Sequence, residues 1–350
     1  MEKNPLVSIV IAAYNEEALL EKNLNTIFNF MKSIENRFDW EVILVNDGSK
    51  DNTGKIADEI AEKNKKFRVL HHKMNKYLGC ALRTGFSECK GDFIITLDLD
   101  LSYSTDHIEK LLSKITETGA DVVLASPYMK GGKVSNVPFS RKLFSRVLNF
   151  LLQIISREDI HTFTGMVRVY KADFLKSLNL KARDFEINTE IIYKSILLRA
   201  IILEIPAHLS WDIQKTVGKN RISSLRLVRG ILSGFMSGFI FRPYIFFILV
   251  GTILLILSSY MLIWIFYHVY LVYPAVHSTS TYFDDRFSNA VAEVFRLRPH
   301  TFTIAGISLV VALQFLSMGF LSVQNKRYFE ETFHLNTTIY KLLNEKKENK

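Results

Sequence analysis

The chain has 350 residues, of which 48% are hydrophobic, and it carries a formal net charge of +9. A disordered chain would be poorer in apolar residues, and a collagen-like or linker chain would need far more than 16 Gly and 7 Pro. The mean hydropathy of +0.12 is high for a soluble protein and low for an entirely membrane-embedded one. The surplus apolar residues must therefore be concentrated in part of the chain. The two cysteines, Cys80 and Cys89, match no disulfide framework or zinc pattern, so we expect reduced thiols in a cytosolic domain.

Short apolar runs alternate with helical segments through the first third of the chain. The expected strands are 6–12, 41–45, 67–70, 93–97 and 122–125, and the expected helices are 16–32, 51–63, 79–89 and 105–118. Ser49 and Ser104 are expected to cap the second and fourth helices. Continuous apolar strands separated by helices are typical of a parallel sheet covered on both faces. The prediction is an α/β, doubly wound and mostly parallel sheet.

Polar and acidic residues follow three of these strands. Ligands of such sheets bind outside the carboxyl ends of the strands. The residues at these ends are Tyr14, Asn15 and Glu16, then Asn46, Asp47, Gly48 and Ser49, and finally Asp98, Leu99 and Asp100. Any one of the acids could be a turn or cap residue. Acids at three equivalent positions predict a functional cleft instead.

The absence of two phosphate-binding motifs narrows the ligand. No G-x-G-x-x-G follows the first strand and no G-x-x-x-x-G-K-[ST] is present, which argues against dinucleotide binding and P-loop hydrolysis. An acid-lined cleft can hold phosphate through a divalent cation, and Mg²⁺ takes one or two carboxylates together with substrate phosphates. Asp98 and Asp100 point the same way at the end of a strand. We therefore predict a Mg²⁺- or Mn²⁺-assisted site for a nucleotide diphosphate.

The same segments resemble the three sequence blocks of family 2 glycosyltransferases, which have a GT-A fold. The blocks are VSIVIAAYNEE, EVILVNDGSKDNTGKIA and FIITLDLDLSYS. The stretch ASPYMKGGKVSNVPFSRKLFSR is similar to a segment of dolichol-phosphate mannose synthases and bacterial polyprenyl-phosphate glucosyltransferases. The family 2 resemblance covers roughly residues 5–225. It implies an inverting hexosyltransferase that moves a sugar from a UDP- or GDP-sugar to polyprenyl or dolichyl phosphate.

The resemblance also implies a role for each residue at the strand ends. Asp47 would bind the nucleobase or ribose of the donor, and Tyr14 and Glu16 would line that pocket. Asp98 would contact the ribose or the metal. Asp100 would be the main ligand of Mg²⁺ or Mn²⁺ on the donor diphosphate. Tyr14 could instead simply pack against its neighbours.

Basic residues are implied for the phosphates. Arg141 matches a family arginine thought to contact phosphate, and we group it with Asp100 as catalytic. Arg146 lies one helical turn further, where it could also be a solvated residue. Further bases for the diphosphate or lipid phosphate, or simply for lipid headgroups, are Lys215, Lys219 and Arg221.

The sequence departs from the mannose-synthase pattern in the stretches 125–128 and 162–168 and at Ser102. The family usually has Gln as a further metal ligand where this chain has Ser102, a weaker ligand that water could replace. Pro127 stands where the family has an arginine, so one phosphate contact is missing. These differences leave the sugar and the donor pose open.

The expected acceptor determines the expected chemistry. A phosphate monoester has its second pKa near 6, so it is ionised at neutral pH and needs no strong general base. We expect a single displacement without a protein nucleophile. Asp159 and His161 are tempting, but a turn or helix-cap role would explain them equally well.

Two uncharged apolar windows, 243–267 and 301–325, are each long enough to cross a bilayer as a helix, which needs roughly 20 residues. We expect a membrane hairpin over 243–325 with an extracytoplasmic loop at about 272–300. Bases flank its outer ends and place both in the cytosol: Arg221, Arg226, Arg229, Arg242, Lys326 and Arg327. Two buried core helices are the alternative.

Three further segments complete the expected organisation. The first is the GT-A domain, 1–222, which is followed by a basic, interfacial amphipathic helix over 223–242. The apolar repeat over 143–155 fits either a second interfacial helix or a core helix. Residues 326–350 are expected to form a cytosolic helix that could mediate homo-oligomer contacts.

Other functions remain open at this point. The acceptor could be another lipid such as diacylglycerol, or a protein. A processive polysaccharide synthase would need a Q-x-x-R-W motif, which 324–328 matches in part, and a polymer channel. Nucleic acid is not an expected partner, because the bases gather beside membrane segments and so favour anionic membrane lipid.

Overall fold

The computed structural model describes residues 4–156, 158–211, 243–276 and 283–348. The chain forms two compact units, one of Met1–Phe241 with Thr332–Lys350 and one of Arg242–Glu331. The predicted interfacial helix 223–242 and the predicted phosphate-binding residues Lys215, Lys219 and Arg221 lie outside the described residues.

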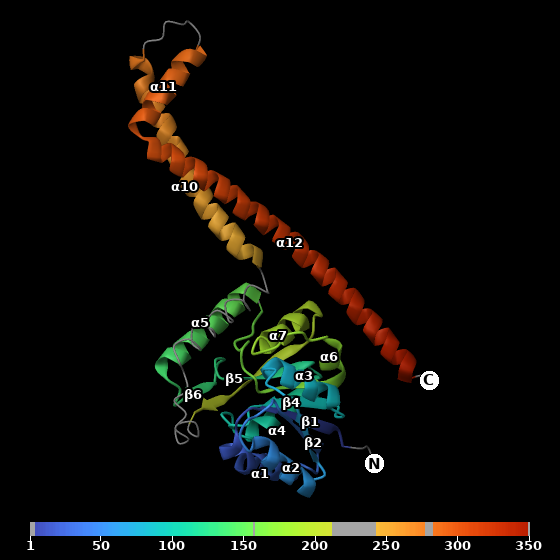
Figure 1. Cartoon of the computed structure of the whole chain (residues 1–350). Helices are drawn as coiled ribbons and strands as arrows, with labels where there is room; N and C mark the ends of the chain where they lie inside the picture. Colours follow the sequence, from blue (N-terminus) through green and yellow to red (C-terminus); the bar gives the residue numbers. More distant parts are fainter. Residues whose placement is uncertain (1–3, 157, 212–242, 277–282, 349–350) are drawn as a thin grey trace. The chain divides into compact units, whose positions relative to one another are not determined.

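The first unit alternates strands and helices (Figure 1). Its strands are β1 (Leu6–Ala13), β2 (Asp39–Asn46), β3 (Phe67–His71), β4 (Phe93–Leu97), β5 (Val122–Ser126), β6 (Lys133–Ser135), β7 (Arg168–Lys171), β8 (Ile202–Pro206) and β9 (His208–Ser210). Its helices are α1 (Glu17–Ser33), α2 (Thr53–Lys63), α3 (Leu78–Glu88), α4 (Asp106–Thr118), α5 (Phe139–Ser156), α6 (Ala172–Ser177) and α7 (Ile187–Leu197).

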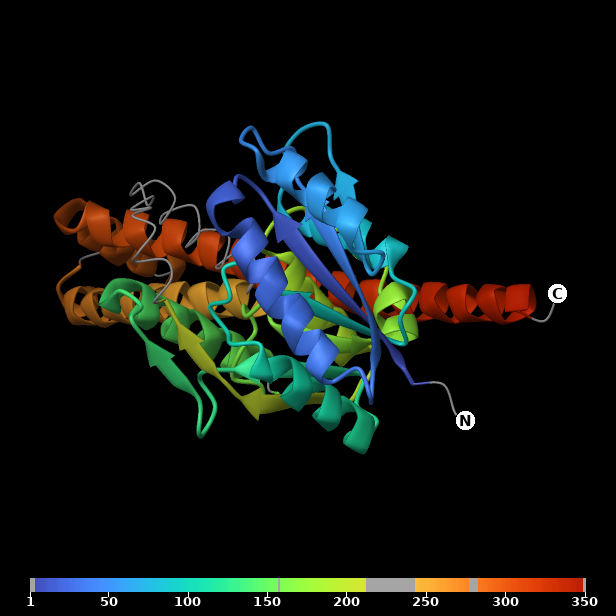
Figure 2. The same ribbon diagram turned by 90° about the horizontal axis from the view of Figure 1, so that it is seen from below.

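The main sheet has the strand order β3-β2-β1-β4-β7-β5-β8 and can be followed in Figure 2. Its neighbouring strands pair in parallel except at β7, which is antiparallel to both β4 and β5. The predicted α/β class with a mostly parallel sheet is therefore confirmed. The expected helix caps are wrong, because Asn52 and Thr105 are the N-cap residues of α2 and α4 in place of Ser49 and Ser104.

Two apolar layers cover the sheet, one on each face. The first core includes side chains of α1, α2 and α4, and the second includes side chains of α3, α5, α6 and α7. Strand residues alternate between them, since neighbouring side chains of a strand point to opposite faces. Ile95 of β4, for example, belongs to the first core and Ile94 to the second.

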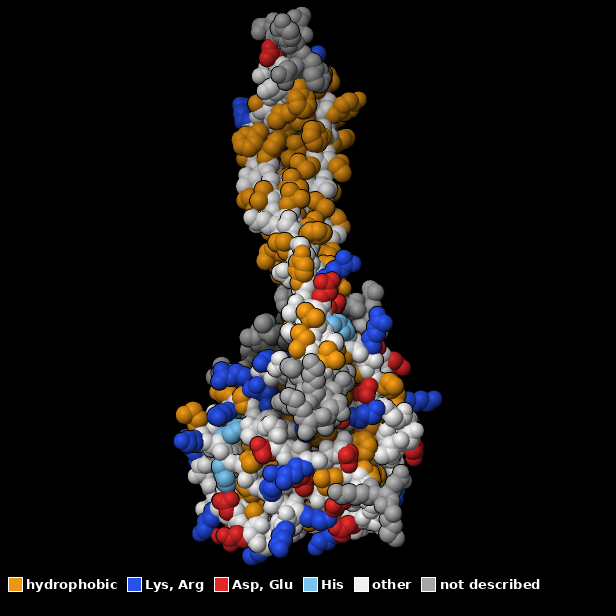
Figure 3. All heavy atoms as spheres, turned by 90° about the vertical axis from the view of Figure 1, so that its right-hand side faces the viewer, with side chains coloured by type: hydrophobic (Ala, Val, Ile, Leu, Met, Phe, Trp, Pro, Cys, Tyr) orange, Lys and Arg blue, Asp and Glu red, His pale blue; other side chains and the backbone are white. Residues whose placement is uncertain are grey.

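The second unit is helical and contains α10 (Pro243–Val272), the short 3₁₀ turn Tyr273–Ala275, α11 (Phe283–Leu297) and the first part of α12 (Pro299–Glu348), whose residues from Thr332 onward belong to the first unit. Two helical segments are long and apolar enough to cross a bilayer, Tyr244–Ala275 and Pro299–Ile339. Hydrophobic side chains cover the surface of these long helices in Figure 3. Helices α10 and α12 contain the two predicted apolar windows, 243–267 and 301–325.

Two helical features of this part of the chain were not predicted. The loop expected at about 272–300 contains α11, whose Ala290 and Val294 pack in one apolar cluster with Ile265 and Val269 of α10. Helix α12 runs without a break through residue 325. The segment expected as a separate C-terminal helix is thus its continuation.

Candidate active site

Three strands bring the predicted acids to one edge of the sheet. Ala13, at the end of β1, is in register with Asn46 of β2. The next residue, Asp47, donates its backbone N–H to the carbonyl oxygen of Ala13 at 2.9 Å. On the other side of β1, Leu97 of β4 is in register with Ile11, and Asp98 follows directly. The carboxyl ends of these strands therefore meet, as the sequence predicted.

Asp47 and Asp98 also share a face of the sheet. Ile43 and Val45 belong to the second core, so the alternation along β2 places Asp47 on that face. Ile94 belongs to the same core, and because side chains alternate along β4, Asp98 points to the same face as Ile94. Both acids therefore lie on the side of the sheet that α3, α5 and α7 cover.

A buried histidine holds Asp47, whose side chain is 5% exposed. One carboxylate oxygen, Oδ1, lies 2.6 Å from Nδ1 of His72 and accepts the backbone N–H of Lys76 at 2.9 Å. Nε2 of His72 lies 3.0 Å from Oγ1 of Thr84 on α3. The sequence analysis missed His72, because it stands 25 residues away from Asp47 and belongs to no local pattern.

The loops at this edge contain left-handed backbone conformations. Asn15, Gly48 and Leu101 have φ angles of 55°, 68° and 50°, and each follows one of the three strands. Such a conformation costs a non-glycine residue roughly 1–2 kcal/mol and is typical of functional loops. Oγ of Ser49 accepts the backbone N–H of Asn15 at 3.0 Å, which joins two of these loops.

The Asp98–Asp100 pair is electrostatically crowded. Burial and the neighbouring charge of Asp100 raise the pKa of Asp98 to about 7. Oδ1 of Asp100 accepts the backbone N–H of Ser102 at 2.9 Å. This hydrogen bond comes from the backbone of Ser102, whereas the sequence analysis considered Ser102 as a weak metal ligand. Burial and Asp98 raise the pKa of the buried Tyr103, which keeps its hydroxyl protonated as a hydrogen-bond donor.

This pair fits a divalent cation. A cation would offset both the burial of the Asp98 charge and its repulsion by Asp100, which together raise the pKa of Asp98. Carboxylate oxygens are ligands that Mg²⁺ and Mn²⁺ prefer. Within the described ranges no group of three or more His, Cys, Asp or Glu side chains could hold a metal. The other ligands would be substrate phosphates and water, which is the usual pattern for Mg²⁺.

Arg141 lies close to the loop that follows β4. Its guanidinium stands over the ring of Trp211, 4.6 Å from the ring centre, and burial holds its pKa below the ordinary value. Trp211 follows β9, whose Ser210 donates its backbone N–H to the carbonyl oxygen of Ser102 at 2.9 Å. These two contacts connect Arg141, by way of the segment 210–211, to the loop that follows β4. Arg146 is exposed on α5.

The two residues predicted to line the nucleotide pocket stand just after β1. Tyr14 is 40% exposed. Glu16 is the N-cap residue of α1 and donates its backbone N–H to Oγ1 of Thr53 at 2.8 Å. Their backbone lies at the same strand edge as Asp47.

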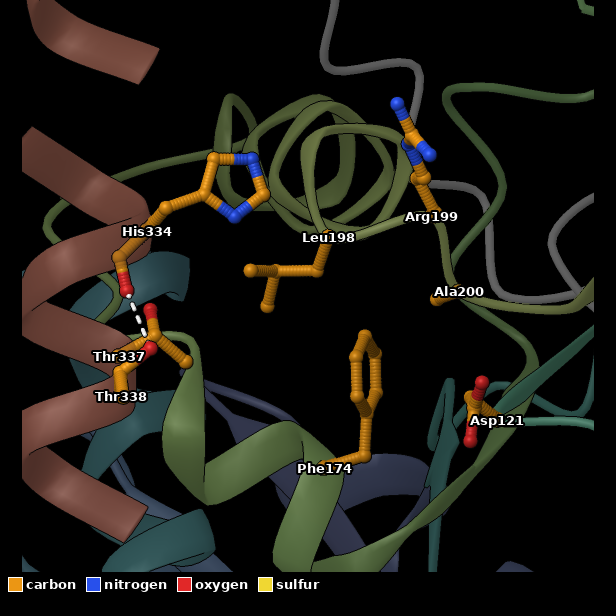
Figure 4. A pocket seen from close by; sticks show the side chains of 8 residues that line it. All are labelled: Asp121, Phe174, Leu198, Arg199, Ala200, His334, Thr337 and Thr338. Atoms are coloured by element: carbon orange, nitrogen blue, oxygen red, sulfur yellow. Dashed lines mark hydrogen bonds between the residues drawn. The ribbon is translucent and has the colours of Figure 1, made fainter. Parts of the chain in front are cut away.

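A pocket of about 300 Å³ opens elsewhere in the first unit (Figure 4). Its lining includes Asp121, just before β5, and Arg199 and Ala200, just before β8. Its other side includes His334, Thr337 and Thr338 of α12. Because β5 and β8 are parallel to β4, this pocket lies at the amino-terminal edge of the strands, away from Asp98.

Comparison with known proteins assigns the α/β unit to a family. Residues 8–178 match the family model of glycosyl transferase family 2. These residues are a family 2 glycosyltransferase domain. The predicted family is thereby confirmed for this domain.

Two curated relatives share this domain. A dolichol-phosphate mannosyltransferase of Pyrococcus furiosus is 31% identical over 190 residues, which cover 54% of this chain and 52% of the relative. A polyprenol monophosphomannose synthase of Mycolicibacterium smegmatis is 28% identical over 180 residues, covering 50% of this chain and 65% of the relative. The chain thus spans between half and two thirds of the length of these relatives.

A solved structure, the glucosyl-3-phosphoglycerate synthase of Mycobacterium tuberculosis in complex with Mn²⁺, UDP and phosphoglyceric acid, superimposes with a TM-score of 0.49 at 17% identity. The superposition covers 67% of this chain and 78% of that one.

Proposed function

We propose that the protein is a membrane-bound, inverting hexosyltransferase that transfers a sugar from a UDP- or GDP-sugar to polyprenyl phosphate on the cytosolic face of the membrane. The observation that carries the proposal is the placement of Asp47 and Asp98 on one face and one edge of the sheet, in a family 2 domain. The names of the two curated relatives support a polyprenyl-type acceptor.

The donor would lie along the strand ends. Asp47, fixed by His72, would hydrogen-bond the nucleobase or ribose, with Tyr14 and Glu16 beside it. Asp98 and Asp100 would hold Mg²⁺ or Mn²⁺ on the diphosphate. The bound cation would act as a Lewis acid and neutralise the departing nucleoside diphosphate.

The remaining residues would act by holding the phosphates in position and by balancing their negative charge. Arg141, kept in place by the ring of Trp211, would hold a phosphate near the Asp98–Asp100 loop. The acceptor phosphate is an anionic nucleophile at neutral pH, so one displacement at the anomeric carbon is sufficient and inverts its configuration. Arg146, Lys215, Lys219 and Arg221 are proposed to attract phosphate or lipid headgroups.

Helix α5 supports a lipid acceptor. One of its faces is anchored on the second core, where Asn149 and Leu152 are buried. The other face exposes an apolar stripe at helical spacing: Leu143, Val147, Phe150, Leu151 and Ile154. Bases at its start, among them Arg141 and Arg146, complement anionic headgroups. We propose that this stripe lies in the membrane surface and guides the lipid phosphate to the site.

The membrane arrangement is proposed from charge and length. Tyr244–Ala275 and Pro299–Ile339 would both span the bilayer. Bases at 221–242 and at 326–327 would keep the outer ends of both helices, and the catalytic domain, in the cytosol. A homo-oligomer through the end of α12 is compatible with this arrangement.

The test is transfer of radiolabel from a panel of UDP- and GDP-sugars to polyprenyl phosphate by the purified full chain in detergent. The expected product is extracted into chloroform, remains charged and requires Mg²⁺ or Mn²⁺. An unchanged rate in EDTA would contradict the metal role. Diacylglycerol assayed in parallel identifies the alternative acceptor.

A matched pair of variants tests the site. Asp100→Asn is expected to lower kcat at least a hundredfold with the thermal unfolding midpoint retained. Asp106→Asn removes an exposed carboxylate that pairs with Lys110, and full activity is expected. Comparable activity in both variants would remove Asp100 from the site.

A further inference from the structure

His161 is held by a buried carboxylate of β8. The side chain of Glu204 is 5% exposed and accepts the backbone N–H groups of His161 and Thr162 at 3.0 and 2.9 Å. Oε2 of Glu204 also lies 2.8 Å from Nδ1 of His161. An ionised carboxylate only accepts hydrogen bonds, so Nδ1 carries the proton and donates it. The other ring nitrogen, Nε2, does not contact Glu204 in this arrangement and can bind a ligand, since the His161 side chain is 35% exposed.

His161 and Glu204 lie on the same face of the sheet as Asp47 and Asp98. Glu204 is in register with Leu124, a residue of the second core, so the two side chains share the face that also carries Asp98. Oγ1 of Thr162 lies 2.7 Å from Oγ of Ser126, the last residue of β5. The loop that carries His161 therefore lies at the carboxyl edge of the strands, where the donor is proposed to bind.

The strand order separates the donor end from this histidine. Asp47 follows β2, the metal-binding acids follow β4, and Glu204 belongs to β8 at the far edge of the sheet. Since neighbouring strands are about 4.8 Å apart, the three steps from β4 to β8 span roughly 14 Å. A donor with its nucleoside at β2 and its diphosphate at β4 would direct its sugar towards β5 and β8. His161 is then on the side from which an acceptor must approach.

The same loop is fastened to α5. Oδ1 of Asn149 accepts the backbone N–H of Phe163 at 2.7 Å, and the Asn149 amide lies 3.1 Å from Oγ1 of Thr164. The helix with the exposed apolar stripe thus adjoins the loop that presents His161. A lipid that lies along the stripe would bring its phosphate to this loop.

We propose that Nε2 of His161 hydrogen-bonds the phosphate of the lipid acceptor, an inference that rests on the proposed transferase function. Glu204 holds the ring through Nδ1, and the doubly protonated ring donates from Nε2 to an anionic phosphate oxygen. Oδ1 of Asp159, whose side chain is 95% exposed, lies 4.0 Å from the same nitrogen. His161 is a binding residue in this scheme and takes no proton from the nucleophile.

Two substitutions separate the two ring nitrogens. His161→Asn places an amide near the position of Nδ1 and keeps the bond to Glu204, but it has no group at the position of Nε2. His161→Gln can place an amide N–H near Nε2. We expect the KM for polyprenyl phosphate to rise about tenfold in His161→Asn and to recover in large part in His161→Gln, with the donor KM unchanged in both.

The assay uses the full chain in detergent with saturating donor, and farnesyl phosphate serves as a second, short acceptor. A phosphate contact predicts the same relative rise in KM for both acceptors. Glu158→Gln changes an exposed residue of the same loop and is expected to leave both KM values unchanged. Thermal unfolding of each variant reports whether the loop is still folded.

Three outcomes overturn the inference. An unchanged acceptor KM in a folded His161→Asn variant means that His161 only fastens the loop. A rise in the donor KM alone assigns Nε2 to the donor. Wild-type protein that transfers no sugar to either lipid phosphate refutes the proposed function itself, and the inference with it. If His161→Asn does not fold, Glu204→Gln, which loosens the ring while keeping the side-chain volume, must raise the acceptor KM.

Discussion

Nδ1 of His72 lies 2.6 Å from Oδ1 of Asp47, and the two side chains are 6% and 5% exposed. The family resemblance implies that Asp47 binds the nucleobase or ribose of the donor, and this role is part of the proposed function. The structure adds that one of its carboxylate oxygens is already engaged by His72 and by the backbone of Lys76. His72 therefore acts as a positioning residue, because it fixes the direction in which the other oxygen points.

His72→Ala is expected to raise the donor KM about tenfold, since the loss of one buried hydrogen bond to a charged group costs roughly 1.5–3 kcal/mol. The acceptor KM should not change, because Asp47 lies on a different strand from the proposed acceptor side. The measurement is nucleotide titration by calorimetry together with steady-state kinetics. His72→Asn, whose amide can reach Asp47, is the matched variant and should bind donor more tightly than His72→Ala. Equal donor affinity in all three proteins would contradict the positioning role.

Glu41 predicts a defined pH dependence of stability. Burial alone would raise the pKa of its carboxyl, but hydrogen bonds from Ser8 (2.6 Å), the backbone N–H of Lys90 (2.8 Å) and Arg68 (3.0 Å) outweigh burial and lower it. A carboxyl with a lowered pKa stabilises the fold above its ordinary value of 4.5, and this contribution is lost as the pH falls through the pKa of the folded state.

Glu41→Gln should therefore reduce the free energy of unfolding by about 1–2 kcal/mol at neutral pH, and the difference from wild type should shrink below pH 4.5. Urea unfolding of both proteins at a series of pH values measures this difference in the free energy of unfolding. Glu117→Gln, at an exposed position on α4, is the control. A difference that stays constant across the series would show that the effect does not come from ionisation of Glu41.

The two cysteines should differ in reactivity. Cys89 is 4% exposed, burial raises the pKa of its thiol to about 12, and Sγ donates to the carbonyl oxygen of Gly85 at 3.2 Å. Because the thiolate is the reactive form, iodoacetamide at pH 8 should label Cys80, which is partly exposed, and spare Cys89. Peptide mass spectrometry with and without denaturant reads the result. Equal labelling in the folded protein would refute the burial of Cys89.

The apolar stripe of α5 leads to a prediction that depends on the substrate. Phe150→Ser combined with Ile154→Ser should raise the KM for polyprenyl phosphate in vesicles several-fold, because the helix would lose contact with the acyl region. The KM for farnesyl phosphate in solution should stay the same. Leu152→Ser, at a buried position of the same helix, is expected to lower the unfolding midpoint instead. An equal effect on both acceptors would argue against membrane contact.

Much of the fold could be predicted because it is encoded locally. The strands around Ile9, Ile43 and Ile95 are continuous apolar runs, and the acids that follow them stand out as polar residues at equivalent positions. Strand β7 was missed because it has four residues and begins with Arg168, a charged side chain that the structure buries against the carbonyl oxygens of Phe163 and Asn188. No periodicity reveals such a strand.

The two histidine–carboxylate pairs could not be predicted for a different reason. His72 and Asp47 are 25 residues apart, and His161 and Glu204 are 43 apart. Each pair forms because loops and strands that are distant in sequence become neighbours in the sheet. The sequence could therefore name Asp47 as functional and leave His161 open, but it could not assign either one its partner.

The order of strands in the sheet has a consequence for how such an enzyme can change. Nucleotide recognition is proposed around β2 and β3, whereas the proposed acceptor residues belong to β8 and to the loop before β7. In this proposal two separate groups of residues control the two substrates, with Asp98 and Asp100 between them. Substitutions beside Asp47 could convert a GDP-sugar enzyme into a UDP-sugar enzyme without disturbing lipid selection, and changes around His161 could alter the lipid without altering the nucleotide. Directed evolution of the donor and acceptor specificities could then proceed independently on the same scaffold.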